Sequence, residues 1–188
     1  MNSTLHTHRL TLRSVRREDA KRIQAVFPRM EIVEYLNASI PWPYPPDGAE
    51  QFLGAVWPDI EAGNRYIWAI TLKDEDGDEL IGLIDLAPYG NFHRGFWLIP
   101  EHWRQGYMTE AVSAVNDFAF DVLEMQTMRL GNAVPNEGSS RIKSKSGATL
   151  VEIVPDVEFV GGIYPEEVWE LTADAWWEHR EAFSRRSE

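Results

Sequence analysis

The chain of 188 residues contains no cysteine. Disulfides, a thiol nucleophile and cysteine-based metal sites are therefore excluded. No apolar run approaches the roughly 20 residues that cross a bilayer, so we expect no membrane partner. The N-terminus lacks the charged and apolar regions of a signal peptide, and the cytoplasm is the expected compartment.

Basic residues are scarce. Lysine and arginine together number 18 against 30 acidic residues, which gives a net charge of -12. Phosphate attraction needs a basic face, so we expect no nucleic-acid partner. The simplest interpretation of the charge is solubility, and the alternative is a cleft that attracts a cationic amine. The histidines show no metal-binding spacing, so no metal is expected: His6, His8, His93, His102 and His179.

Hydrophobic periodicity predicts one α+β domain over residues 1–188. Helices are expected over 18–27, 30–37, 48–62, 107–124, 139–146 and 174–183, the last held by Trp176 and Trp177. Strands are expected over about 8–15, 65–73, 80–86, 92–99, 128–134, 149–154 and 167–172, with a hairpin turn at 74–78. The order predicts a mixed, mostly antiparallel seven-stranded sheet with helices on both faces. The strand, helix and strand between 92 and 134 predict a right-handed parallel crossover.

The most informative segment runs from Trp103 to Ala111. It follows a predicted strand and Pro100, contains Gly106, and opens the longest amphipathic helix. A turn from a strand into a helix directs backbone N–H groups outward, and the helix dipole adds positive potential. Together they form an anion site suited to phosphate. A plain turn at Gly106 is the alternative interpretation.

This segment resembles the acetyl-CoA-binding motif of the GNAT N-acetyltransferases, and most closely the RimJ/RimL-like branch that acetylates ribosomal-protein N-termini. The segment Asn136 to Gly147 resembles the Asn-x-x-Ser-x-x-x-x-x-Lys-x-Gly helix of the same branch. Arg104 stands where that branch commonly has glycine, and Met108 where it has alanine or glycine. The resemblance implies a GNAT fold in which the fourth and fifth strands splay apart around the pantetheine arm.

The resemblance also implies residues for binding acetyl-CoA. Backbone of the fourth strand would face pantetheine, the loop N–H groups would hold the pyrophosphate, and Arg104 and Lys145 would contact adenosine phosphates. Asn136 would bind the pantetheine arm. The implied set is Trp97, Leu98, Ile99, Arg104, Gln105, Gly106, Tyr107, Met108, Thr109, Asn136 and Lys145. Solvated surface residues are the alternative for Asn136 and Lys145.

Two residues carry the catalytic roles that the resemblance implies. Ser139 matches the serine that donates to the leaving thiolate, and Glu158 matches the proposed general base, acting directly or through water. An N-cap role is the alternative for Ser139, and a surface strand carboxylate for Glu158. A backbone N–H near Leu98 or Ile99 would stabilise the oxyanion. Glu101 and Asp85 are weaker candidates for the base.

The acceptor would lie near Trp42 and Tyr44, whose proline-rich loop resembles the acceptor loop of the same branch. Asp85 alternates with apolar neighbours in a strand and is expected to face the acceptor. The resemblance therefore implies transfer of an acetyl group to a protein N-terminal α-amine in a ternary complex. A small-molecule amine acetyltransferase and a non-catalytic acyl-CoA-binding module are the alternatives. The oligomeric state is left open, a homodimer being one alternative.

Overall fold

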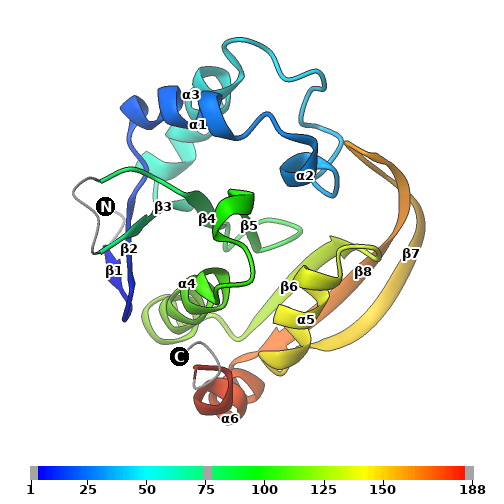
Figure 1. The fold of residues 1–188 in the computed structure, drawn as a ribbon. Coiled ribbons are helices and arrows are strands. Elements are labelled where there is room, and N and C mark those ends of the chain that lie inside the picture. Colours follow the sequence, from blue (N-terminus) through cyan, green and yellow to red (C-terminus); the bar gives the residue numbers. More distant parts are fainter. Residues whose placement is uncertain (1–3, 74–77, 185–188) are drawn as a thin grey trace.

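The computed structural model of the protein describes residues 4–73 and 78–184. The hairpin turn expected at 74–78 therefore lies, apart from Asp78, outside the described residues. The N-terminal half forms an antiparallel five-stranded sheet in the order β1 (Leu5–His6), β2 (Leu10–Ser14), β3 (Tyr66–Leu72), β4 (Gly82–Leu86) and β5 (Arg94–Leu98). Figure 1 shows this meander running from β1 at the left edge of the view to β5 near its centre.

The C-terminal half forms a second, three-stranded antiparallel sheet. Its order is β6 (Thr127–Ala133), β8 (Gly162–Thr172) and β7 (Thr149–Phe159). The hairpin β7–β8 is almost twice as long as the strands expected over 149–154 and 167–172, since each of its strands has 11 residues. A β-bulge shifts the register between Val154 and Val157, so the pairing continues past the proline at 155.

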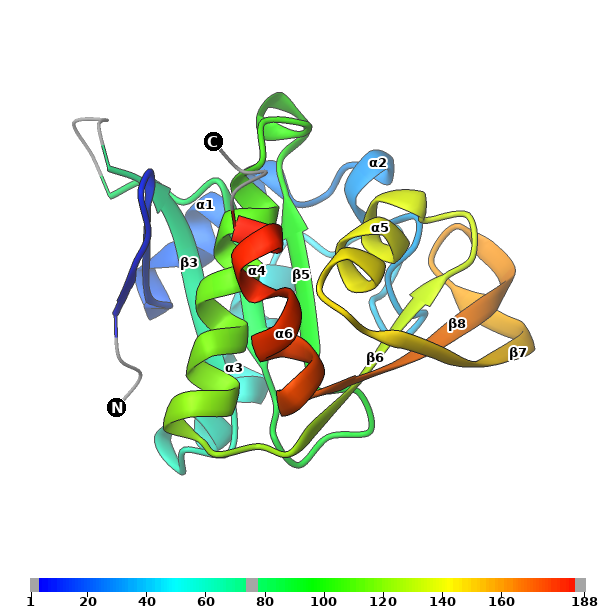
Figure 2. The same cartoon turned by 90° about the horizontal axis from the view of Figure 1, so that it is seen from below.

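The α+β class is confirmed, but the described part of the chain has eight strands in two sheets rather than one sheet of seven. All of the described ladders are antiparallel. β5 and β6, the fourth and fifth strands of the prediction, belong to different sheets. They meet where His93 N–H donates to the Arg129 carbonyl at 2.9 Å, and Figure 2 shows them diverging from there. This is the splay that the resemblance implies between the fourth and fifth strands, and β6 pairs with β8 instead.

Helices cover both faces of the five-stranded sheet (Figure 2). α1 (Ala20–Val26) and α3 (Gly48–Glu61) cover one face, and α4 (Tyr107–Asp117) with α6 (Ala173–Ser184) covers the other. α4 continues into a single π-helical turn, η3 (Phe118–Val122). Trp176 is fully buried as expected, whereas Trp177 is 44 % exposed and does not anchor α6. No helix in the described ranges is long and apolar enough to cross a membrane.

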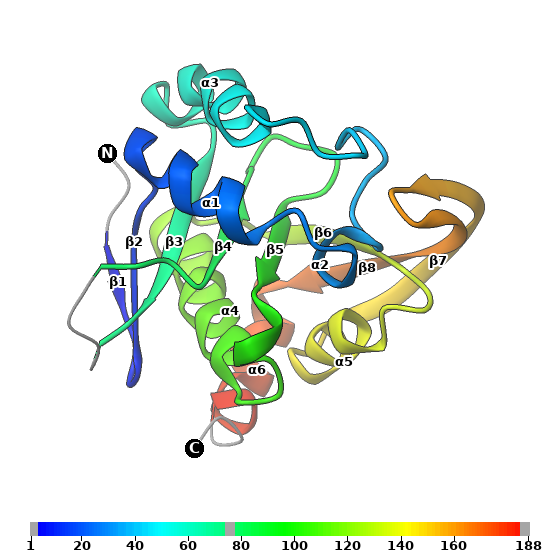
Figure 3. The ribbon, with the colours of Figure 1, turned by 45° about the horizontal axis from the view of Figure 1, so that its top comes forward.

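The tip of the β7–β8 hairpin is bonded to the N-terminal half. Val160 N–H donates to the Leu36 carbonyl at 2.9 Å, and Gly161 N–H donates to the Glu34 carbonyl at 2.9 Å. Asn37 forms a β-bridge with Phe159. These strand-like bonds explain why α2 (Met30–Val33) is shorter than the helix expected over 30–37. Figure 3 shows α2 and the hairpin tip side by side.

Candidate functional site

The loop between η2 (Pro100–His102) and α4 presents a row of backbone donors; we call residues 103–109 the amide loop. Arg104 and Gly106 adopt positive φ angles of 60° and 82°. The first helical bond runs from Glu110 N–H to the Gly106 carbonyl at 3.0 Å. Within the described residues, the N–H groups from 105 to 109 donate to no backbone acceptor. Alternating left- and right-handed backbone of this kind forms an anion-binding concavity at a helix N-terminus.

Side-chain contacts hold the amide loop in place. Arg9 Nη1 donates to the Gln105 carbonyl at 2.9 Å, and Gln105 Nε2 donates to the Glu101 carbonyl at 2.9 Å. Arg9 also pairs with Glu110 of α4 at 2.8 Å. The donors are therefore fixed before any anion arrives, which lowers the entropic cost of binding one.

Arg104 occupies a left-handed conformation, with φ at 60°. Arg104→Gly is expected to raise the free energy of unfolding by about 1 kcal/mol. A side chain in the left-handed conformation costs roughly 1–2 kcal/mol, and part of the gain is offset because glycine loses more conformational entropy on folding. Urea unfolding measures the change. Arg104→Ala is the control, since it keeps the strained backbone without the guanidinium. A variant with glycine that is no more stable than the alanine variant would contradict the prediction.

The free edge of β5 faces the splay. Ile99 N–H donates to the Ile81 carbonyl at 2.9 Å. Donors alternate between the two edges of an antiparallel strand, so the N–H groups of Phe96 and Leu98 point toward β6. The Leu98 carbonyl accepts a bond from the Trp103 indole at 2.6 Å. Of the two expected oxyanion donors, Leu98 is the one whose N–H lies on the open edge.

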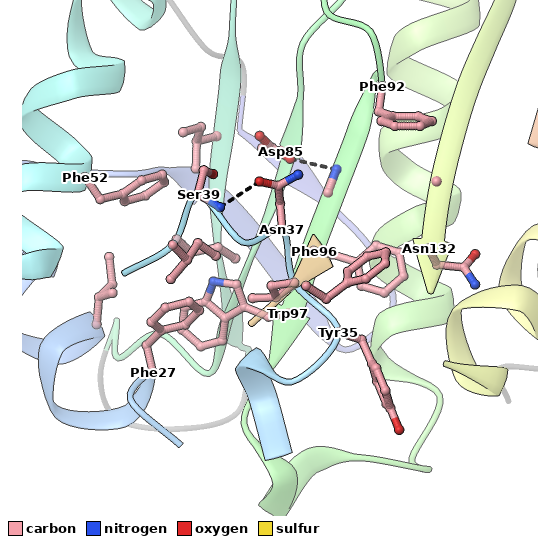
Figure 4. Close-up of a pocket in the computed structure, with 18 of the residues that line it drawn as sticks. Phe27, Tyr35, Asn37, Ser39, Phe52, Asp85, Phe92, Phe96, Trp97 and Asn132 are labelled. Carbon is pink, nitrogen blue, oxygen red and sulfur yellow. Dashed lines mark hydrogen bonds between the residues drawn. The ribbon is translucent and has the colours of Figure 1, made fainter. Parts of the chain in front are cut away.

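A cavity of about 440 Å³ opens beside β5. Its wall is largely aromatic, and Figure 4 shows the rings of Phe27, Phe96 and Trp97 among those around it. Of the expected site residues, Tyr44, Asp85 and Trp97 line it. Trp42 is 40 % exposed and is not part of the wall. Phe96, which the resemblance places against the pantetheine arm, lines the cavity as well, whereas sequence analysis did not identify four further lining residues used below: Phe27, Arg65, Asn132 and Glu166.

Asp85 lies in the cavity wall with both carboxylate oxygens engaged. Oδ1 accepts from the Gly95 N–H at 2.7 Å, and Oδ2 accepts from Arg65 Nε at 3.0 Å. Burial raises the pKa of Asp85, and the Arg65 guanidinium opposes that shift. An engaged carboxylate is a poor proton acceptor, so the geometry favours a role in shaping the wall.

Glu166 of β8 is the second carboxylate in the wall. It is half-buried, its backbone pairs with both neighbouring strands, and its carboxylate accepts no hydrogen bond from the described residues. Burial raises the pKa of Glu166, whereas Arg129 and Lys143 lower it. Glu158 of β7 is exposed and is not part of the wall, whereas its neighbour Phe159 is buried in it. Consecutive strand residues point to opposite faces, so the structure does not bring Glu158 to the cavity.

α5 (Glu137–Lys145) carries the second predicted segment. Asn136 is its N-cap, and Asn136 Oδ1 accepts from the Ser139 N–H at 3.1 Å. The alternative that Ser139 caps this helix is therefore wrong; the helix begins two residues earlier than expected, because Asn136 supplies the cap. Ser139 is buried, and its Oγ accepts from Lys143 Nζ at 2.6 Å. Lys145 is exposed.

These features together form a phosphate-sized donor loop, an open strand edge and an adjoining cavity. Residues 9–149 match the family model described as "Acetyltransferase (GNAT) domain". The chain belongs to the GNAT acetyltransferases, and it is an enzyme of that acyltransferase class.

Known relatives agree with this membership. The chain is 32 % identical over 152 residues to the uncharacterized N-acetyltransferase YoaA of Bacillus subtilis (strain 168), covering 76 % of this chain and 81 % of that protein. Its fold is similar to that of the ribosomal-protein-S5-alanine acetyltransferase from Vibrio fischeri, with TM-score 0.77, 17 % identity and coverage of 93 % and 99 %. The spermidine N-acetyltransferase from Vibrio cholerae, solved with CoA and spermine, gives TM-score 0.73, 18 % identity and coverage of 89 % and 98 %.

Proposed function

We propose that this protein transfers the acetyl group of acetyl-CoA to a primary amine, and that the acceptor is the α-amine of a peptide N-terminus. The observation that carries the proposal is the amide loop, whose unpaired N–H groups adjoin the open edge of β5. Acetyl-CoA is a substrate that this loop would hold by its pyrophosphate. A CoA-bound neighbour of the same fold supports this assignment.

The described residues fit the rest of that substrate. Gly131 of β6 faces the cavity, where a β-carbon would lie 2.9 Å from the Phe92 ring and 3.1 Å from Glu166 Oε1. The space beside β6 therefore depends on the missing side chain. The Leu98 N–H would donate to the developing oxyanion, and Asn136 stays our proposal for a pantetheine contact. Exposed Arg104 and Lys145 would reach adenosine phosphates.

The cavity would hold the amine. An α-amine has an ordinary pKa near 8, so it needs little help to lose its proton at neutral pH. A carboxylate would accept that proton: Glu158, which lies outside the wall, stays a prediction for this role through water, and Glu166 is the candidate that lines the cavity. The aromatic wall favours a second candidate acceptor, a small amine with an aromatic or apolar body.

The function is tested by titrating acetyl-CoA in a calorimeter and by measuring thiol release with a panel of acceptors. The panel holds short peptides with free N-termini, N-blocked copies of the same peptides, aromatic amines and polyamines. We expect acetyl-CoA binding, and thiol release only with peptides whose N-terminus is free. Release with aromatic amines alone would select the second candidate. Binding without release across the panel would favour a non-catalytic acyl-CoA-binding module, and no binding would overturn the proposal.

A further inference from the structure

Lys143 is a buried lysine on the inner face of α5, with 2 % of its surface exposed. Its Nζ donates to Ser139 Oγ at 2.6 Å and to Asn132 Oδ1 at 2.7 Å. Asn132 belongs to the cavity wall. The ammonium group therefore lies directly behind two residues of the site, one of which is the serine implied for the leaving thiolate.

A second buried cation lies near Lys143. Arg94 of β5 is 6 % exposed and donates through Nη1 to Asn116 Oδ1 of α4. Its Nε and Nη2 atoms, and Nδ2 of Asn116, are buried and donate to no acceptor among the described residues. Unpaired buried donors are costly, and their surplus of positive potential favours negative charge nearby.

The charges around Lys143 set its protonation. Burial and the Arg94 guanidinium lower the pKa of Lys143 to about 7, against the opposite effect of Glu167 and Glu166. At neutral pH the amine is therefore close to half-protonated, and it gives up and regains a proton readily. Because the Ser139 oxygen accepts from Lys143, the single hydroxyl proton of Ser139 is directed elsewhere.

We propose that Lys143 is a positioning residue and proton source: it stands behind Ser139 and replaces the proton that the Ser139 hydroxyl donates to the leaving thiolate. The inference rests on the proposed function. The amine nitrogen bonds to the carbonyl carbon, the carbon–sulfur bond breaks, and its electron pair leaves on sulfur. The Ser139 proton passes to sulfur while a Lys143 proton passes to Ser139 Oγ. The attacking nitrogen loses its proton to a carboxylate or water, and Lys143 regains one from water.

The first test needs no turnover. The pKa of the CoA thiol bound to the protein is measured from thiolate absorbance in the wild type and in Lys143→Met, with Arg141→Met as the control because Arg141 is an exposed cation of the same helix. We expect a thiol pKa about 1 unit lower in the wild type and in the control than in Lys143→Met. Equal thiol pKa values in all three proteins would overturn the inference.

Desulfo-CoA, which lacks the thiol, separates this inference from the proposed function. It should bind the wild type and Lys143→Met with affinities within about twofold, because the amide loop is unchanged. If neither CoA nor desulfo-CoA binds the wild type, the proposed function fails. If both bind and the thiol pKa does not respond to Lys143, only the inference about Lys143 fails.

The second test is the pH profile of turnover. Lys143→Met is expected to lower kcat about 10- to 100-fold with little change in KM for acetyl-CoA. The decline of wild-type kcat above pH of about 7, where Lys143 loses its proton, should be absent in the variant. Lys143→Gln repeats the measurement if the methionine variant is poorly folded. A lowered kcat that keeps the wild-type decline would assign Lys143 a purely structural role.

Discussion

Gly106→Val is expected to weaken acetyl-CoA binding about 100-fold, or roughly 2.7 kcal/mol. Gly106 has φ at 82°, a conformation that a β-branched residue adopts only under strain. The loop would rearrange to relieve it, and the N–H groups from 105 to 109 would no longer converge. Several charge-assisted bonds to one anion would weaken together. Calorimetric titration with acetyl-CoA measures the loss.

Gly63→Val is the matched control. Gly63 also has a positive φ, 74°, and a β-carbon there meets nothing within 4 Å. The two variants therefore carry similar backbone strain, but only one changes the amide loop. We expect Gly63→Val to lower stability and to keep its acetyl-CoA affinity. Gly106→Ala should show a smaller loss of affinity and serves if valine prevents folding. Wild-type affinity in Gly106→Val would exclude this loop as the pyrophosphate site.

Glu166→Gln is expected to lower kcat about 100-fold at neutral pH, the size typical of a lost general base. Burial raises the pKa of Glu166 toward the working pH, and its carboxylate lies in the cavity wall. Wild-type kcat/KM should rise with pH through that raised pKa, because the base acts when deprotonated. Since the unfolded chain releases this proton at a lower pH than the folded protein, ionisation of Glu166 costs stability, and glutamine removes that cost. The variant should therefore stay folded, and stopped-flow or steady-state thiol release measures its kcat.

Glu158→Gln and Asp85→Asn are the matched variants that decide which carboxylate is the general base. Glu158→Gln removes the same charge from the opposite face of the same hairpin. Asp85→Asn alters a carboxylate whose oxygens already accept hydrogen bonds from Arg65 and from the Gly95 N–H. We expect smaller losses of kcat from both. The largest loss in Glu158→Gln would assign the base to Glu158, acting through water, and unchanged kcat in Glu166→Gln would exclude Glu166.

Local chemistry made the amide loop predictable. Its strand, breaker, glycine and helix follow one another within about twenty residues, so the sequence order alone sets the geometry. Asn136 and Ser139 were named from the resemblance of their segment to a family helix, and that resemblance did not show which of them caps α5. Which of them caps α5 depends on where the helix begins, and the two residues lie three positions apart.

The cavity could not be predicted in this way, because its wall is assembled from distant segments. Phe27, Phe96 and Glu166 come from different elements, and no spacing relates them. Glu166 carries one sequence signal, since it lies two residues before the buried Val168 and therefore on the same face of the strand. Lys143 carries a second sequence signal. It follows Ser139 by four residues and Ser140 by three, and side chains at these spacings lie on the same face of a helix. The long hairpin was missed because a bulge accommodates the proline at 155.

The backbone hydrogen bonds between residues 34–36 and 160–161 join the N-terminal half of the molecule to the tip of the β7–β8 hairpin. About 125 residues separate the partners, and about 100 separate Arg9 from its partners in the amide loop and α4, so both sets of contacts close long loops at similar cost in chain entropy. Asn37 and Phe159, which form the β-bridge beside these bonds, also line the cavity, so opening the contact would open the wall of the amine pocket as well. Gly161 marks the narrowest point, where a β-carbon would lie 2.5 Å from Glu34 Cγ.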